Sequence, residues 1–387
     1  MLERSISVPV LYYHSIGDHN TIRPWSFLSF SLKLFQDQIK YLYKNDFHAI
    51  NLEELYNYMK YNAPIQPKSI VITFDDGFLD NWVFAFPILK KYNMKATIYV
   101  NPSFVDKRNI IRPTIDDVWS NKLDLDELDW WGYLSWDEMK KMEETGLIDI
   151  QSHAYTHTWY FCGYTIVDFY HPHAPYYWLY WNEFPEKKSQ WLTEYNEEDI
   201  EYGRPIYAHG KALVSRQYFE DTNIKEELVS YVKKKGNRTF FESPDWKKKL
   251  FNIASNYISK NKLKGEMESE KQYEQRIYYE LAESKKQIED NLEKQVKFLC
   301  WPGGGCNSFT LQIAKNIGYI STTKGIFPNK FGNDSFQISR ISAVSPLKFQ
   351  FFKKEYERFF LKLQLNRGQD KLFGNIFGKA LKNFQKK

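Results

Sequence analysis

The first 157 residues alternate between short apolar runs and stretches in which apolar residues recur at helical spacing. A short, continuous apolar run is typical of a strand buried in a parallel sheet. Four such runs occur, at Val8–Tyr13, Ser69–Phe74, Ala96–Val100 and Ile148–Gln151. Helical spacing lies between them, over Phe35–Asn45, Asn51–Tyr61, Asp80–Tyr92 and Ser135–Thr145. This order predicts an α/β fold whose parallel sheet is closed, or nearly closed, into a barrel by its crossover helices.

Two of the expected helices carry signals for where they begin and end. Asn51 fits the N-cap of the second helix, and Glu53 and Glu54 follow in its first turn. Gly146 fits the end of the fourth helix, because glycine readily adopts the left-handed conformation common there. These ends support the helices that the periodicity predicts.

The pattern changes after His157. Residues 158–222 are rich in aromatic side chains and have few periodic segments, whereas residues 223–295 are helical in pattern and highly charged. Alternation resumes with strands expected at Val296–Trp301, Tyr319–Thr322 and Gln337–Ile341 and a helix at Ser308–Asn316. We therefore predict a barrel built from residues 1–157 and 296–345, a large insertion at 158–295, and a helical tail at 346–387.

Composition and charge narrow the function. The chain has 387 residues and a net charge of +5, but residues 353–387 carry ten Lys or Arg against three Asp or Glu, so the rest is nearly neutral. This distribution argues against a broad nucleic-acid-binding surface. Cys162, Cys300 and Cys306 are too few for a disulfide framework and are expected to be reduced. No apolar run reaches 18 residues and the N-terminus resembles no signal peptide, so we expect a cytoplasmic protein.

The C-terminal tail is amphipathic. Apolar residues recur at three- and four-residue steps between Leu372 and Phe384, with lysines around them, and Phe359–Leu363 precede them in a similar basic context. A basic amphipathic helix is typical of an interfacial anchor, which would bring the protein to the inner face of the membrane. The alternative is a terminal helix that docks on the barrel.

Two adjacent carboxylates, Asp75 and Asp76, follow the second expected strand directly. At such a strand end one carboxylate can bind a cation while the other stays ionised and acts as a base. Gly77 allows the sharp turn that follows. The alternative is a polar turn, since Asp-Asp-Gly is common in turns.

His153 and His157 follow the fourth expected strand and lie four residues apart. Two histidines at this spacing can converge on one metal ion, although two surface histidines are the alternative. The carboxyl ends of parallel strands meet at one edge of the sheet, so the Asp pair is expected nearby. Together they form a set of two His and one carboxylate that leaves positions open for water or substrate.

The sequence TFDDG at residues 73–77 and SHAYTH at 152–157 resemble the first two motifs of the polysaccharide deacetylases, a carbohydrate esterase family (family 4) that shares the NodB-homology domain. The resemblance implies a distorted (β/α) barrel of the NodB type. It also implies one divalent metal ion held by Asp76, His153 and His157, with zinc expected and cobalt, nickel or manganese as alternatives. Asp75 would then be the catalytic base.

The third motif departs from the usual family form. Cys300 stands where the family has an arginine that pairs with the base, so the base must be oriented in some other way. The following Trp301, Pro302 and Gly303 resemble the aromatic-Pro-x-Gly form of poly-N-acetylglucosamine deacetylases and are expected to bind substrate. The usual late Leu-x-His motif is absent. In that branch the acid histidine lies near the N-terminus after a tyrosine, which His14 matches.

Within the insertion, Tyr202 and Arg204 lie in a stretch with turn formers and are candidates for binding a sugar at the rim, with a structural turn as the alternative. The function expected is metal-dependent N-deacetylation of an N-acetylated polysaccharide, oligosaccharide or lipid-linked sugar. The alternative is a catalytically impaired carbohydrate-binding module of the same fold.

Overall fold

The computed structural model describes residues 5–18, 25–323, 328–345 and 353–370. The chain divides into two compact units. Unit 1 comprises residues 1–155, 283–304 and 318–387, and unit 2 comprises residues 156–282 and 305–317. The candidate chemistry of Asp75, Asp76 and His153 lies in unit 1.

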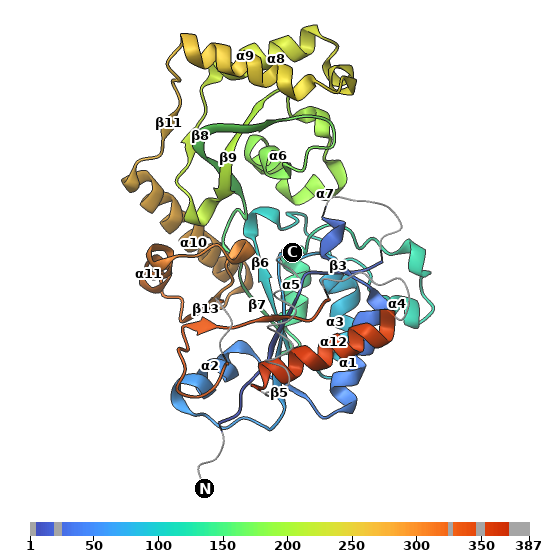
Figure 1. The fold of residues 1–387 in the computed structure, drawn as a ribbon. Coiled ribbons are helices and arrows are strands. Elements are labelled where there is room, and N and C mark those ends of the chain that lie inside the picture. Colours follow the sequence, from blue (N-terminus) through green and yellow to red (C-terminus); the bar gives the residue numbers. More distant parts are fainter. Residues whose placement is uncertain (1–4, 19–24, 324–327, 346–352, 371–387) are drawn as a thin grey trace. The chain divides into compact units, whose positions relative to one another are not determined.

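Unit 1 is built on a parallel sheet, in which Figure 1 labels β5, β6, β7 and β13. In the described residues the sheet has nine strands, in the order β14-β13-β12-β7-β6-β5-β1-β15, with β4 also paired to β5. Its strands are β1 (Val10–Tyr13), β4 (His48–Ala49), β5 (Ser69–Phe74), β6 (Ala96–Val100), β7 (Ile148–Ser152), β12 (Phe298–Leu299), β13 (Ser321–Thr323), β14 (Gln337–Ile338) and β15 (Ile341–Ser342). Every residue of β5 and β6 is buried, as their continuous apolar sequences predict. The predicted α/β fold with a parallel sheet is confirmed.

The sheet curls because of how its two ends are connected. β14 and β15 lie at opposite ends of the strand order, yet only Ser339 and Arg340 separate them along the chain. Three residue steps span at most about 11 Å, so the two edges must come close. The single strand predicted at Gln337–Ile341 is therefore wrong. The chain leaves one edge of the sheet and joins the other within that segment.

The helices of unit 1 connect these strands. They are α1 (Leu32–Lys44), α2 (Leu52–Tyr61), the π-helical turn η2 (Asn81–Ala85) that runs into α3 (Phe86–Lys91), α4 (Ile115–Trp119), α5 (Trp136–Glu143) and α12 (Lys353–Gly368). Short 3-10 turns occur at η1 (Ser26–Leu28), η3 (Pro102–Phe104), η4 (Leu125–Glu127) and η9 (Pro302–Gly304), and the short strands β2 (Ser15–Ile16) and β3 (Ser29–Phe30) pair with each other. Asn51 caps α2 as predicted, because its side chain accepts a hydrogen bond from the Glu54 backbone N–H at 2.8 Å.

The first part of the predicted tail is a docked helix. α12 packs on α1 and β15, and its Phe360, Leu361 and Leu363 are buried, whereas Phe359 is exposed (Figure 1). This burial favours the docked-helix alternative for Lys353–Gly368. The amphipathic stretch that was predicted as an anchor, residues 371–387, lies outside the described residues. No helix in the described ranges is long and apolar enough to cross a membrane.

Unit 2 contains a long antiparallel pair, β8 (Trp159–Phe169) with β9 (Pro205–Lys211), and a short pair, β10 (Tyr218–Phe219) with β11 (Glu266–Met267). Its helices are α6 (Tyr177–Glu183), η5 (Pro185–Gln190), α7 (Trp191–Glu194), η6 (Glu197–Asp199), η7 (Ala212–Val214), α8 (Thr222–Lys234), η8 (Asn237–Glu242), α9 (Trp246–Lys260) and α11 (Ser308–Ile317). α10 (Glu270–Leu292) begins in unit 2 and ends in unit 1. The strand β8 could not be predicted from the sequence, because irregular pairing breaks its alternation of buried and exposed positions.

Candidate active site

The candidate site is formed where neighbouring parallel strands end. Tyr13 pairs with Phe74, so the residues that follow, His14 and Asp75, leave adjacent strands at the same level. Leu299 of β12 pairs with Ser152 of β7, which places Cys300 beside His153. Asp75, His153 and Cys300 are all buried, and their candidate ligand atoms lie within 4.8 Å of one another. The topology therefore brings together residues that are far apart in the sequence.

The turn after β5 has an unusual backbone. Asp76 has a φ of 72° and Gly77 a φ of 68°, both in the left-handed region. A Cβ atom at Gly77 would lie 2.9 Å from a side-chain carbon of Val100, so glycine is required by both space and backbone. Backbone strain of this kind is concentrated at functional sites.

Asp76 and His153 face each other at a distance of 3.3 Å between Oδ1 and Nε2. The other ring nitrogen, Nδ1, lies 2.9 Å from the carbonyl oxygen of Cys300. A neutral imidazole that donates its Nδ1–H to this carbonyl presents the lone pair of Nε2 toward Asp76, which is the usual orientation of a metal-binding histidine. His157 lies four residues further along the chain, in unit 2, and its part in holding a metal ion stays a prediction.

The electrostatics around His153 favour positive charge. Burial lowers the pKa of the His153 imidazole, but Cys300, the hydrogen bond to Asp76 and the charge of Asp75 together raise it well above its usual range. The protein without a metal thus stabilises a cation at this position. Buried carboxylate and imidazole ligands of this kind suit a divalent ion such as Zn²⁺, so the residues present fit the metal that the resemblance implies.

Arg340 supplies the guanidinium that is missing from the third motif. Its Nη1 and Nη2 donate hydrogen bonds to the two carboxylate oxygens of Asp75, at 2.6 and 2.8 Å. This bidentate pairing is the strongest geometry available to an arginine and a carboxylate. The partner of Asp75 is therefore an arginine on the link between β14 and β15, not a residue at position 300, while the role of Asp75 as the base stays a prediction.

The surroundings of Arg340 hold the guanidinium in place. It lies over the rings of Tyr12 and Tyr99, at 5.0 and 5.5 Å from their centroids, and its Nη2 is 2.9 Å from the sulfur of Cys300. Burial raises the pKa of the Asp75 carboxyl, but the charge and hydrogen bonds of Arg340 outweigh burial and hold that pKa well below its usual range. Asp75 is thus kept ionised although it is buried.

Sequence reasoning missed Arg340, although a signal was present. It is the only arginine in residues 296–345, the segment predicted to complete the barrel. The family motif places a guanidinium near the base, so Arg340 was the candidate in this segment for the partner of Asp75. It was overlooked because it lies 40 residues beyond Cys300, the motif position.

His14 lies within reach of the same carboxylate. Its Nε2 is 3.9 Å from Oδ2 of Asp75, and about a quarter of its side chain is exposed. The edge of its ring packs against Tyr12, with the ring centroids 5.8 Å apart. The structure thus places the predicted acid beside the predicted base, while its role stays a prediction.

The predicted substrate-binding residues of the third motif are placed in different ways. Trp301 is almost fully buried, and its backbone N–H donates to the Thr323 hydroxyl at 3.2 Å. Pro302 is buried as well, whereas Gly303 is exposed and has a φ of 53°. Only Gly303 therefore offers surface to a ligand in this conformation, and substrate binding by all three residues stays a prediction.

Tyr202 and Arg204, in unit 2, are engaged in structural contacts. Arg204 forms ion pairs with Glu183 and with Glu220, the latter at 2.6 Å. The hydroxyl of Tyr202 donates to a carboxylate oxygen of Glu197 at 3.1 Å. These contacts favour the structural-turn alternative, and a role in substrate binding stays a prediction.

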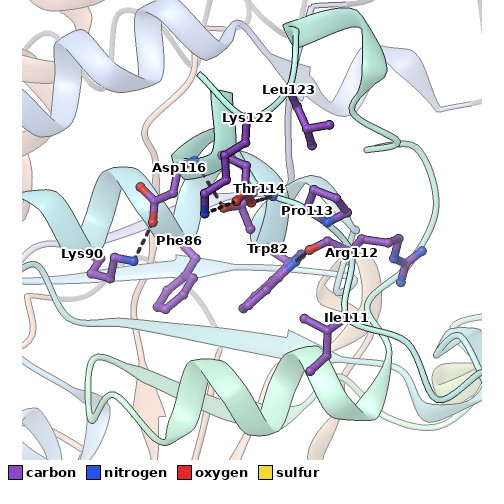
Figure 2. A pocket seen from close by; sticks show the side chains of 11 residues that line it. Trp82, Phe86, Lys90, Ile111, Arg112, Pro113, Thr114, Asp116, Lys122 and Leu123 are labelled. Atoms are coloured by element: carbon purple, nitrogen blue, oxygen red, sulfur yellow. Dashed lines mark hydrogen bonds and ion pairs between the residues drawn. The ribbon is translucent and has the colours of Figure 1, made fainter. Parts of the chain in front are cut away.

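A separate hollow of about 490 Å³ lies beside α3 and α4 of unit 1 (Figure 2). Trp82 and Phe86 stack beneath it, but both rings are more than nine-tenths buried. At its rim Asp116 is paired with Lys90 at 2.5 Å. The hollow therefore has its charges neutralised and little aromatic surface open, unlike the cluster around Asp75.

Comparison with known proteins agrees with this fold. Residues 62–202 match the family model described as polysaccharide deacetylase. This matched region contains Asp75, Asp76, His153 and His157.

Two curated relatives match part of this chain. The chain is 29% identical over 155 residues to the Bacillus subtilis protein YxkH, named as a polysaccharide deacetylase, and 30% identical over 129 residues to a poly-beta-1,6-N-acetyl-D-glucosamine N-deacetylase of Staphylococcus aureus. These matches cover 40% and 33% of this chain, and 45% and 37% of the relatives, so the chain spans less than half of their length.

The solved structures resemble the fold over most of the chain. A de-N-acetylase from Aggregatibacter actinomycetemcomitans has a TM-score of 0.53 at 19% identity, and the match covers 89% of this chain and 98% of that one. The BpsB deacetylase domain from Bordetella bronchiseptica has a TM-score of 0.51 at 18% identity, covering 87% and 96%. The expected barrel of the deacetylase type is thereby confirmed.

Proposed function

We propose that the chain is a metal-dependent N-deacetylase that hydrolyses the acetamide group of an N-acetylated sugar within a polysaccharide. The observation that carries the proposal is the buried Asp75, kept ionised by Arg340 and placed beside Asp76, His153 and His14. A carboxylate base, an acidic group and a set of metal ligands are the parts that amide hydrolysis needs.

A polymer of β-1,6-linked N-acetylglucosamine is the substrate to test first. Its support is the name of the Staphylococcus aureus relative, which is 30% identical to this chain over 129 residues. The aromatic-Pro-x-Gly sequence at Trp301–Gly303 supports the same branch of the family. Oligosaccharides and lipid-linked sugars with the same acetamide group are the alternatives.

Asp76, His153 and His157 would hold a divalent ion, which when bound polarises the acetamide carbonyl and lowers the pKa of an attacking water. Asp75 accepts a proton from that water as its oxygen bonds to the carbonyl carbon. Arg340 keeps Asp75 ionised for this task. His14 donates a proton to the nitrogen as the carbon–nitrogen bond breaks, so acetate and a free amine leave.

The alternative, a catalytically impaired carbohydrate-binding module, was based on the arginine missing at position 300. Arg340 removes that reason, because the base has its bidentate partner. The proposed activity is tested by measuring acetate release from β-1,6-linked N-acetylglucosamine oligomers with zinc, cobalt, nickel or manganese added, and with a chelator. Release that depends on metal supports the proposal, and its absence with every metal and oligomer contradicts it.

The metal assignment has its own test. His153→Ala removes a buried ligand, so the variant should lose both stoichiometric metal and acetate release. Metal content measured by mass spectrometry after dialysis decides the point. A variant that keeps one metal ion per chain would show that His153 is not a ligand.

A further inference from the structure

One pair of side chains, Asp80 and Asn81, holds the three residues that follow β1, which are His14, Ser15 and Ile16. The Asn81 side-chain amide donates to the carbonyl oxygen of His14 at 2.9 Å. The Ser15 hydroxyl donates to Oδ2 of Asp80 at 2.5 Å, and the backbone N–H of Ile16 also donates to the Asp80 carboxylate. The backbone that carries His14 is therefore fixed at three successive points.

The pair itself is buried and internally bonded. Asp80 and Asn81 have no exposed surface, and the Asn81 amide also donates to Oδ1 of Asp80 at 2.7 Å. No group among the described residues donates to the Asn81 Oδ1 atom. The Asn81 side chain therefore acts as a donor of two hydrogen bonds. One goes to the carbonyl oxygen of His14 and the other to the carboxylate of Asp80.

The position of the pair in the fold is also unusual. Asp80 precedes the π-helical turn of Asn81–Ala85, and such turns are rare and frequently lie at functional sites. Burial raises the pKa of Asp80 to about 7, against the hydrogen bonds from Ser15, Ile16 and Asn81 that lower it. A fully buried carboxyl is costly for stability, so its retention here calls for a role that an apolar side chain could not perform.

We propose that Asp80 and Asn81 are positioning residues that fix the His14 segment so that the His14 imidazole stays beside Asp75. This inference rests on the proposed function, because it assigns the pair to the placement of the predicted acid. The two residues touch neither the candidate metal ligands nor Asp75 in any hydrogen bond of the described chain. They act only through the backbone and hydroxyl of residues 14–16.

The test uses two substrates that differ in their need for an acid. Release of an amine requires protonation of its nitrogen, whereas 4-nitrophenyl acetate releases a stable phenolate without it. Asn81→Leu, which keeps the size but removes the donor, and Ser15→Ala should each lower acetamide hydrolysis, Asn81→Leu by about 10²-fold. Hydrolysis of 4-nitrophenyl acetate should change by less than about threefold. His14→Gln should show the same pattern and serves as the reference.

Asp116→Asn, at the rim of the hollow in Figure 2, is the matched control, since it changes a carboxylate of the same unit that is paired with Lys90. It should leave both reactions unchanged. Equal losses of both reactions in Asn81→Leu and Ser15→Ala would show a general structural role and overturn the proposal. Unchanged acetamide hydrolysis in both variants would overturn it as well.

A second readout does not depend on activity. The ring signals of His14 in a nitrogen–proton NMR spectrum are identified by their absence in His14→Gln. They should shift or broaden in Asn81→Leu and stay in place in Asp116→Asn. Unmoved His14 signals in Asn81→Leu would overturn the proposal. Wild-type protein that hydrolyses no acetamide, with His14 signals that do move, would contradict the proposed function and leave the positioning role intact.

Discussion

Asp75 and Asp80 are two aspartates five residues apart that are almost equally buried but differ in their partners. Asp75 receives two hydrogen bonds from the guanidinium of Arg340. Asp80 receives its hydrogen bonds from the neutral groups of Ser15, Ile16 and Asn81. As a result the pKa of Asp75 lies well below its usual range, whereas burial raises that of Asp80 to about 7.

The difference shows that burial alone does not decide the charge of a carboxyl group. Neutral donors only partly offset desolvation at Asp80, while a cation more than offsets it at Asp75. One stretch of chain therefore holds a carboxylate ready to accept a proton and a carboxyl group suited to hold a backbone segment. Two titratable groups whose environments separate their pKa values in this way commonly have different functions.

The largest effect on activity is expected when Asp75 and Asp80 are each replaced by asparagine and the two variants are compared. Asp75→Asn should lower acetate release by about 10²–10⁴-fold, because it removes the base with little change in volume. It should lower 4-nitrophenyl acetate hydrolysis too, since both reactions need the attacking water deprotonated. Asp80→Asn should spare the ester reaction. Equal loss of both reactions in the two variants would mean that the two carboxyls do not differ in role.

Removing the cation from Asp75 should make its environment resemble that of Asp80. Arg340→Gln leaves a buried carboxylate without its charged partner, which costs about 3–5 kcal/mol of stability, so urea unfolding is measured alongside acetate release. Both should fall. Arg340→Lys should retain part of each, because lysine keeps the charge but not the bidentate geometry.

A rescue variant keeps this test decisive if Arg340→Gln folds poorly. Adding Cys300→Arg to Arg340→Gln places a guanidinium at the position where the family motif has one. Partial recovery of acetate release relative to Arg340→Gln is expected. Wild-type activity in Arg340→Gln alone would show that Asp75 does not need the arginine.

The raised pKa of Asp80 predicts a pH dependence of stability. In the folded protein Asp80 keeps its proton up to about pH 7, whereas the unfolded chain releases it near its ordinary value of 3.8. Stability from this group is therefore present at low pH and is lost as the pH rises from about 4 to 7, by at most about 1.4 kcal/mol per pH unit. Asp80→Asn does not titrate, so its stability relative to wild type should improve over this range. Urea unfolding of both proteins at about pH 5 and 8 tests this, and a constant difference between them would contradict it.

The smallest effect is expected at Cys300. Its thiol lies 3.6 Å from Oδ1 of Asp75 and accepts a hydrogen bond from Arg340, but Arg340 already binds both carboxylate oxygens. Cys300→Ala should therefore change acetate release by only a fewfold, in line with about 0.5–1.5 kcal/mol for one hydrogen bond. A loss as large as that of Asp75→Asn would assign the thiol a direct part in the reaction.

The parts of the molecule that sequence could predict are those set by local chemistry. The buried strands were visible as continuous apolar runs, and the cap of α2 was visible because Asn51 precedes a first turn that holds Glu53 and Glu54. The strand-end carboxylates could be predicted as well, since Asp75 and Asp76 follow β5 directly.

The parts that escaped prediction depend on contacts between distant residues. Arg340 reaches Asp75 only because the sheet curls and the chain passes from one edge to the other at Ser339–Arg340. The role of Asn81 depends on its contact with His14, which follows β1 and lies 67 residues earlier in the chain. In unit 2, the long strand β8 escaped because irregular pairing disturbs its alternation.

The central claim is that Arg340 keeps Asp75 ionised as the base, and the pH dependence of kcat/KM tests it most directly. A general base becomes protonated and inactive as the pH falls through its pKa. Because the pKa of Asp75 is low, protonation of Asp75 should not reduce wild-type kcat/KM between about pH 5 and 8. Without the guanidinium, burial should raise that pKa. Acetate release by Arg340→Gln, with metal saturating, should then fall toward low pH more steeply than that of wild type. Profiles of the same shape for the two proteins would contradict the claim.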